Sequence, residues 1–223
     1  MKVIRKVEYF KFDTIEFDTV LNKQLPYYLE MLLKALNSKD LKTYIHSKSV
    51  FQYAKLIANE LYLTYRERTI LYYAAYTHDI GKLAISNELL NKKESLNNEE
   101  FKIIKKHPVY SYDILSKIKE LEHVAMIAKH HHEKYDGTGY PSGLKGNNIP
   151  YLSRILTVID SFDAMTSQRS YNKIKSYETR IQELIENSYS QFDYKIVYAF
   201  IRSLKPYYKF NNFQPSKELY SFF

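Results

Sequence analysis

Residues 71–82 read LYYAAYTHDIGK, and the fold of the chain can be worked out from this stretch. Leu71 and Ala74 lie at helical spacing, and the same spacing leads on to His78. We therefore expect His78 on the inner face of a helix, with Asp79 beside it at the helix end. Because ionisable side chains are seldom fully buried without a partner, this pair is a candidate for a functional site.

Four other segments predict the same arrangement, in which the apolar stripe of a helix continues into an ionisable side chain. The stripes are Val50, Ala54, Ile57 and Leu61 leading to His46; Phe101 and Ile104 leading to His107; Val124, Ile127 and Ala128 leading to His131, with His132 adjacent; and Leu156 leading to Asp160 and Asp163. Pro108 is expected to interrupt or restart its helix. Side chains from separate helices are thus predicted to meet in one core.

The chemistry of this set favours metal ions. A single inward histidine is more often a hydrogen-bonded core residue, and the histidine run 130–132 could be a solvated tract. Burying several carboxylates and imidazoles together is costly, whereas a pair of divalent cations would neutralise the carboxylates and use the imidazole lone pairs. The chain has seven histidines and no cysteine, so imidazole and carboxylate groups must supply the ligands. His123 is expected to have no role.

The apolar spacing as a whole predicts an all-α protein. Helices are expected over residues 26–37, 41–63, 66–79, 98–117, 120–133, 150–168, 176–188 and 193–204. The alternating pattern of residues 1–20 instead predicts a short hairpin or an extended lead segment. Four of the five glycines, at positions 137, 139, 143 and 146, predict one long loop among the helices.

The predicted domain organisation has three parts. Residues 1–39 form a lead segment with a short helix, and residues 40–205 form the main domain, a size that can bury a substantial core. Residues 206–223 form an aromatic, proline-broken tail, which we expect to pack as a strap over the bundle or against a partner.

The composition sets limits on location and partners. The charged N-terminal segment and the absence of any run of ~18 apolar residues predict a cytoplasmic protein that does not enter a membrane. The net charge of +8 favours phosphate-bearing partners, although the lysines are spread along the chain and base composition of the genome would explain them equally. Since no clustered basic stripe or binding motif is present, we expect no nucleic-acid partner.

The motifs resemble those of the HD-GYP family of the HD phosphohydrolase superfamily. They are HDIGK at 78–82, KKHP at 105–108, HHEKYDGTGYP at 131–141 and DSFDAMTSQRSY at 160–171. The resemblance covers residues 40–205 and implies that this range is the catalytic domain. It also implies an HD-domain helical bundle with extra helices and a GYP loop.

The resemblance further implies a two-metal site with a bridging hydroxide that attacks a phosphodiester. One cation would be held by His46, His78, Asp79 and Asp160, and the other by His107, His131 and His132, with Asp79 bridging the two. The expected cofactors are two divalent ions, iron or manganese first, because these ligand types suit such metals.

Other residues match positions that contact the substrate or support the ligands. Lys82 resembles a lysine that contacts the scissile phosphate, although an ordinary surface lysine needs no explanation. Arg169 resembles a residue that holds the other phosphate, and Tyr140 would contact a base or simply form a structural turn. Glu133 and Asp163 are expected to orient imidazoles or the bound water.

Three positions depart from the family pattern. Lys42 stands where some members have a glutamate for a third metal, so we predict two metals. Ser49 replaces a common arginine, and Asn172 replaces a common basic residue for which Lys173 is a candidate substitute in substrate binding. These differences bear on substrate affinity or choice.

The function implied by the resemblance is hydrolysis of cyclic di-GMP to pGpG and onward to GMP. One alternative is hydrolysis of another cyclic dinucleotide, such as cyclic GMP-AMP, or of another nucleotide. A second alternative is a non-catalytic sensor that binds cyclic di-GMP and signals through a partner. Regulation is expected to act through the lead segment, through a signalling protein partner or through homodimerisation.

Overall fold

The computed structural model describes residues 25–165 and 176–206. Within these ranges the chain is built of helices and contains no extended strand, so the all-α prediction is confirmed. The α-helices are α1 Leu25–Lys39, α2 Leu41–Glu60, α3 Tyr65–Thr77, α4 Asn87–Leu90, α5 Asn98–Ile104, α6 His107–Leu115, α7 Glu122–Lys129, α8 Tyr151–Ala164, α9 Tyr177–Glu186 and α10 Tyr194–Leu204. Short 3-10 helices cover Ile80–Ala84 (η1), Lys119–Leu121 (η2) and Gly146–Asn148 (η3).

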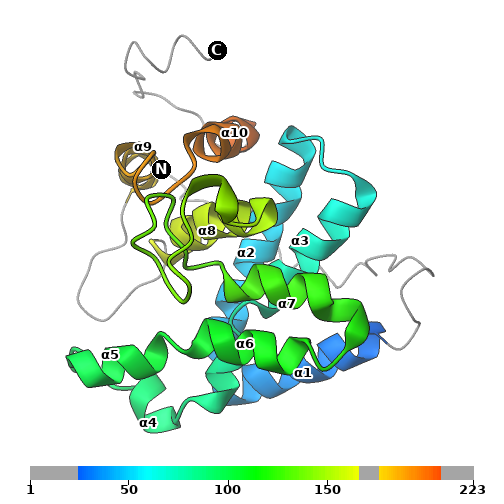
Figure 1. Ribbon diagram of the computed structural model, residues 1–223, viewed down its shortest axis with the longest axis vertical. Helices are drawn as coiled ribbons and strands as arrows, with labels where there is room; N and C mark the ends of the chain where they lie inside the picture. Colours follow the sequence, from blue (N-terminus) through cyan, green and yellow to red (C-terminus); the bar gives the residue numbers. More distant parts are fainter. Residues whose placement is uncertain (1–24, 166–175, 207–223) are drawn as a thin grey trace, which may run out of the picture.

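The helices form one bundle around a continuous apolar core. Helices α2, α3, α7 and α8 contact one another in the middle, and α9 and α10 lie at the end opposite α1, α4 and α5 (Figure 1). Phe162 of α8 is fully buried and meets Tyr53 and Phe200 edge to face, which joins α8 to α2 and α10. Candidate ligands lie on α2 and α8 and just beyond the ends of α3 and α7, so the core and much of the site share the same supports.

Polar caps determine where several helices begin. The Asp40 carboxylate accepts hydrogen bonds from the backbone N–H groups of Lys42 and Thr43, which starts α2. Thr64 and Glu67 form a capping box at α3. Each cap satisfies backbone donors that the helix itself cannot pair.

One expected break is confirmed, and one predicted helix ends earlier than expected. The range 98–117 is divided into α5 and α6 at Pro108, because proline lacks an N–H group and favours the first turn of a new helix. The predicted helix over 120–133 ends at Lys129, so His131 and His132 lie in a turn beyond it. In addition, η1 and α4 occupy residues 80–90, where no helix was predicted.

Some predictions fall on residues that the structure does not describe. These include the lead segment 1–20, the tail beyond Pro206, and the candidate substrate residues Arg169 and Lys173. The domain boundary between residues 39 and 40 stays a prediction. Across this boundary α1 packs against α2 and η1, and it buries Leu29, Leu33 and Leu36. Within the described ranges no helix is both long enough and apolar enough to cross a lipid bilayer.

Candidate metal centre

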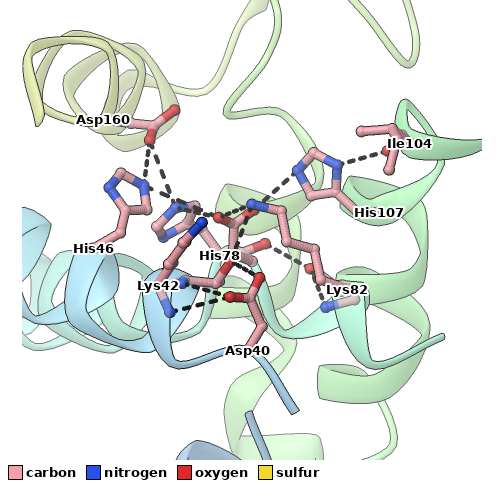
Figure 2. A network of polar contacts seen from close by, with 12 residues as sticks. Asp40, Lys42, His46, His78, Lys82, Ile104, His107 and Asp160 are labelled. Atoms are coloured by element: carbon pink, nitrogen blue, oxygen red, sulfur yellow. Dashed lines mark hydrogen bonds and ion pairs between the residues drawn. The ribbon is translucent and has the colours of Figure 1, made fainter. Parts of the chain in front are cut away.

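The predicted ligand side chains meet at one place in the bundle. His46 comes from α2, His78 and Asp79 from the end of α3, and Asp160 from α8, while the others begin α6 or follow α7. Figure 2 shows His46, His78, His107 and Asp160 pointing toward one another from different elements. Segments separated by more than a hundred residues in sequence thus contribute to a single cluster, as the helical spacing predicted.

The cluster contains three groups whose ligand atoms lie within 4.8 Å of one another. The groups are His107, His131 and His132; His46, His78 and Asp79; and His78, His131 and Asp160. The first group is the set expected for one cation. The other two groups share His78 and together contain the four residues expected for the second cation, with His131 as an additional neighbour.

Asp79 lies between the groups, with one carboxylate oxygen on each side. Oδ1 is 3.1 Å from Nε2 of His107, whereas Oδ2 is 3.5 Å from Nε2 of His78 and 4.0 Å from Nε2 of His46. A carboxylate that faces two sets of imidazoles through different oxygens has the arrangement required of a bridging ligand.

Backbone carbonyls determine which nitrogen of three histidines faces the cluster. Nδ1 of His78 donates to the Ala75 carbonyl at 3.0 Å, and Nδ1 of His131 donates to the Ala128 carbonyl at 2.6 Å. Nδ1 of His107 likewise donates to a carbonyl three residues earlier, at 2.8 Å. A carbonyl can only accept, so each Nδ1 carries a proton and the Nε2 atom of each ring faces the cluster.

The geometry at His107 follows directly from the sequence HP. In a continuous helix the N–H group of residue 108 would bond to the carbonyl of Ile104, but Pro108 has no N–H. The Ile104 carbonyl is the one that accepts from Nδ1 of His107. The proline thus ends α5 and leaves free the backbone acceptor that orients the imidazole.

His46 is held by two carboxylates of α8. Its Nδ1 lies 2.6 Å from Oδ2 of Asp163, and its Nε2 lies 2.8 Å from Oδ1 of Asp160. Burial by itself lowers the pKa of His46, but the hydrogen bonds to Asp160 and Asp163 outweigh burial and raise the pKa to about 10. The proton on Nε2 thus lies between two candidate ligands, where a cation would replace it.

The donor set fits divalent cations. Nε2 of His78 is buried and has no hydrogen-bond partner among the described residues, which leaves a lone pair for a metal. Burial lowers the pKa of His132 to about 3 and the pKa of His131 well below its usual value, so both imidazoles are neutral at pH 7. Burial would raise the pKa of Asp79, but Lys82 and His78 hold it well below the usual range. Neutral imidazoles and an ionised carboxylate are the ligand forms that metals require.

Lys82 lies at the edge of the cluster. Its Nζ is 2.7 Å from Oδ2 of Asp79 and 3.5 Å from Oγ1 of Thr43. The side chain is 22% exposed, so it is partly accessible from solvent. Thr43 was not selected from the sequence, although it lies three residues before His46 and therefore on the same side of α2.

The loop that carries the glycines at positions 137, 139, 143 and 146, called the GYP loop, is held by Glu133. Both carboxylate oxygens of Glu133 accept from loop backbone N–H groups, those of Ser142 at 2.7 Å and Leu144 at 3.1 Å. Glu133 also contacts Nδ1 of His130 at 3.3 Å, rather than any imidazole of the three groups. Its observed contacts are therefore with the loop and with a histidine that was not expected to bind metal.

Tyr140 lies beside His132, a member of the first group of ligands. Its ring centroid is 4.9 Å from that of His132, and its N–H group donates to the His132 carbonyl at 3.1 Å. The preceding Gly139 permits this approach, because a Cβ atom there would lie 2.2 Å from the backbone nitrogen of Lys134. The expected contact between Tyr140 and substrate stays a prediction.

A first prediction concerns Asp163, which we expect to act by holding His46. The Asp163→Asn change keeps the shape of the side chain but removes the charge that orients the imidazole. We expect the affinity for the metal to fall roughly 10-fold or more. Competition with a fluorescent chelator measures this affinity. Asp113→Asn removes an exposed carboxylate of α6 and is the matched control; equal affinities in the two variants would contradict the proposed role.

With this geometry in view, comparison with known proteins gives the family. The model of the HD domain family matches residues 30–196, and the chain belongs to this family. The motifs at residues 78–82 and 131–141 further place it in the HD-GYP group.

Several curated proteins are similar to this chain. The 3'3'-cGAMP-specific phosphodiesterase 3 of Vibrio cholerae is 36% identical over 170 residues, which is 74% of this chain and 37% of that protein. A cyclic di-GMP phosphodiesterase of Thermotoga maritima is 37% identical over 189 residues, covering 84% of this chain and 51% of that protein. The chain therefore spans about a third to a half of the length of these relatives.

Solved structures share the fold. A cyclic GMP-AMP specific phosphodiesterase of V. cholerae superimposes with a TM-score of 0.62 at 20% identity, over 80% of this chain and 48% of that one. The HD domain of the Listeria monocytogenes phosphodiesterase PgpH has a TM-score of 0.57 at 17% identity, over 78% of this chain and 94% of that one. At these identities the similarity concerns the fold.

Proposed function

We propose that this chain is a metal-dependent phosphodiesterase that hydrolyses a cyclic dinucleotide in a site for two divalent cations. The observation that carries the proposal is the position of Asp79. Its Oδ1 faces His107 at 3.1 Å and its Oδ2 faces His78 at 3.5 Å, so one carboxylate serves both groups of imidazoles. A purely structural histidine cluster would not require an ionised carboxylate at its centre.

The residues assigned to each cation follow from the groups described above. One cation takes His107, His131 and His132, the other takes His46, His78 and Asp160, and Asp79 belongs to both. When bound, such a pair lowers the pKa of a coordinated water and offsets negative charge on phosphate oxygens. Iron and manganese are the proposed metals, because imidazole and carboxylate ligands suit both.

The protein side chains around the pair have separate tasks. Lys82 is partly exposed and is held near Asp79, so its ammonium can approach a phosphate bound at the pair and stabilise charge that develops there. Asp163 holds Nδ1 of His46 and leaves Nε2 for the cation. Arg169 is proposed, from the sequence, to hold the second phosphate.

Cyclic di-GMP is the proposed substrate, and 3'3'-cGAMP is the alternative. Relatives of similar identity carry each name, which supports the substrate class but does not separate its members. The net charge of +8 agrees with a ligand that bears two phosphates. A non-catalytic sensor is less well supported, since loss of ligands would be expected in such a protein and every proposed ligand is present here.

The test is a nucleotide panel with purified protein loaded anaerobically with iron or with manganese. We expect linear products from cyclic di-GMP or 3'3'-cGAMP, separated by chromatography, with cyclic di-AMP as a third member of the panel. Turnover of cyclic di-GMP should give pGpG first and GMP afterwards. Tight binding of a cyclic dinucleotide without hydrolysis in either metal form would identify the sensor instead.

A further inference from the structure

Ser111 of α6 is a fully buried serine whose hydroxyl joins two backbone groups of the turn after α3. Its Oγ–H group donates to the His78 carbonyl at 2.5 Å, and the Gly81 N–H group donates to Oγ at 2.9 Å. One hydroxyl can donate and accept at the same time, so the two hydrogen bonds coexist. Ser111 has no place among the proposed ligands or substrate contacts.

The position of Ser111 in α6 connects the two metal groups. Ser111 follows His107 by four residues, so both side chains lie on the same face of α6. His107 belongs to one group of candidate ligands, whereas His78 and Asp79 belong to the other. The hydroxyl therefore ties the backbone that carries one group to the helix that carries the other.

The turn and α6 approach each other at the distance of direct backbone contact. A Cβ atom on Gly81 would lie 2.0 Å from the His107 carbonyl oxygen and 2.5 Å from the Ser111 nitrogen, so only glycine fits. Asp79 stands at the start of η1 but forms no side-chain cap there. The two hydrogen bonds of the Ser111 hydroxyl thus hold the turn after α3, and the Asp79 carboxylate of this turn is directed to the cluster.

We propose that Ser111 is a positioning residue that determines how far apart the two metal groups lie and thereby lets Asp79 serve both. This inference rests on the two-cation site proposed above. A change at Ser111 should leave each set of imidazoles able to bind an ion, because their Nδ1 hydrogen bonds are independent of it, while the joint site is weakened.

The experiment is a titration of the metal-free protein with Mn(II), followed by electron paramagnetic resonance. For the unaltered protein we expect two bound ions and the spectrum of a magnetically coupled pair. For Ser111→Ala we expect affinity for the second ion to fall about 10- to 100-fold, with the coupled spectrum replaced by that of isolated ions at the same concentration. Ser111→Cys, which keeps the size of the side chain with a weaker hydrogen bond, should change in the same direction and serves if the alanine protein does not fold.

Ser203→Ala is the matched control. Ser203 is also a buried serine, and its hydroxyl donates to the Phe200 carbonyl within α10, away from the cluster. We expect this variant to bind two coupled ions like the unaltered protein. The positioning role would be overturned if both Ser111 variants bound two coupled ions with unchanged affinity. It would also be overturned if Ser203→Ala lost as much affinity for the second ion as Ser111→Ala. Either result would leave the proposed function intact. A single ion in the unaltered protein would overturn the two-cation site and this inference with it.

Discussion

Asp79→Asn protein is expected to lose hydrolysis of the cyclic dinucleotide by on the order of 10³-fold, which corresponds to about 4 kcal/mol of transition-state stabilisation. Asparagine keeps the size of the side chain but offers one neutral oxygen in place of two charged ones. It cannot face His107 and His78 with equivalent oxygens, as Asp79 does at 3.1 and 3.5 Å. Both metal occupancy and rate should therefore fall.

Elemental analysis and steady-state kinetics on the same preparation check this prediction. We expect fewer than two ions per chain, together with a fall in kcat. Asp113→Asn removes an equivalent charge from an exposed position and should retain both activity and metal. Normal turnover by Asp79→Asn would refute the bridging role, whatever its metal content.

Lys82→Ala protein is expected to keep its metals and lose rate by roughly 10²- to 10³-fold in kcat. Lys82 supplies no metal ligand, since an ammonium has no lone pair, but its Nζ lies 2.7 Å from Oδ2 of Asp79 at the edge of the cluster. Its removal takes away a positive charge from the place where a bound phosphate would develop negative charge.

Two further variants isolate this role: one keeps the positive charge at position 82, and the other removes a remote lysine. Lys82→Arg should recover part of the rate, because the charge returns in a different shape. Lys102→Ala removes an exposed lysine of α5 that pairs with Glu99 and should behave like the unaltered protein. Loss of bound metal from Lys82→Ala, in proportion to its loss of rate, would assign Lys82 to the support of Asp79 instead.

Helix boundaries were the weakest part of the sequence-based prediction. The interruption expected at Pro108 is confirmed, because α5 ends at Ile104 and α6 begins at His107. The predicted helix through residue 133 was wrong, since apolar spacing does not mark the turn at which a chain leaves a helix. These breaks matter to the site, because unpaired carbonyls at helix ends orient His78, His107 and His131.

Several contacts of the site had no signal in the sequence. Ser111 and Thr43 are small polar residues on predicted helices, and their types alone do not distinguish them from exposed ones. Glu133 was expected to orient imidazoles or the bound water; its carboxylate contacts Nδ1 of His130 and, without any signal in the sequence, also accepts from the backbone of Ser142 and Leu144. The partners in each case come from backbone segments whose approach depends on how the helices pack.

Local periodicity was sufficient to predict which side chains turn inward, because a helix repeats every 3.6 residues and its apolar stripe locates the core. His46, His78, His107, His131 and Asp160 were found in this way, and the motifs around them placed the chain in its family. Periodicity carries no information on the distance between helices. The meeting of both oxygens of Asp79 with separate imidazoles, and the hydroxyl that ties α6 to the turn after α3, arise from packing between segments remote in sequence.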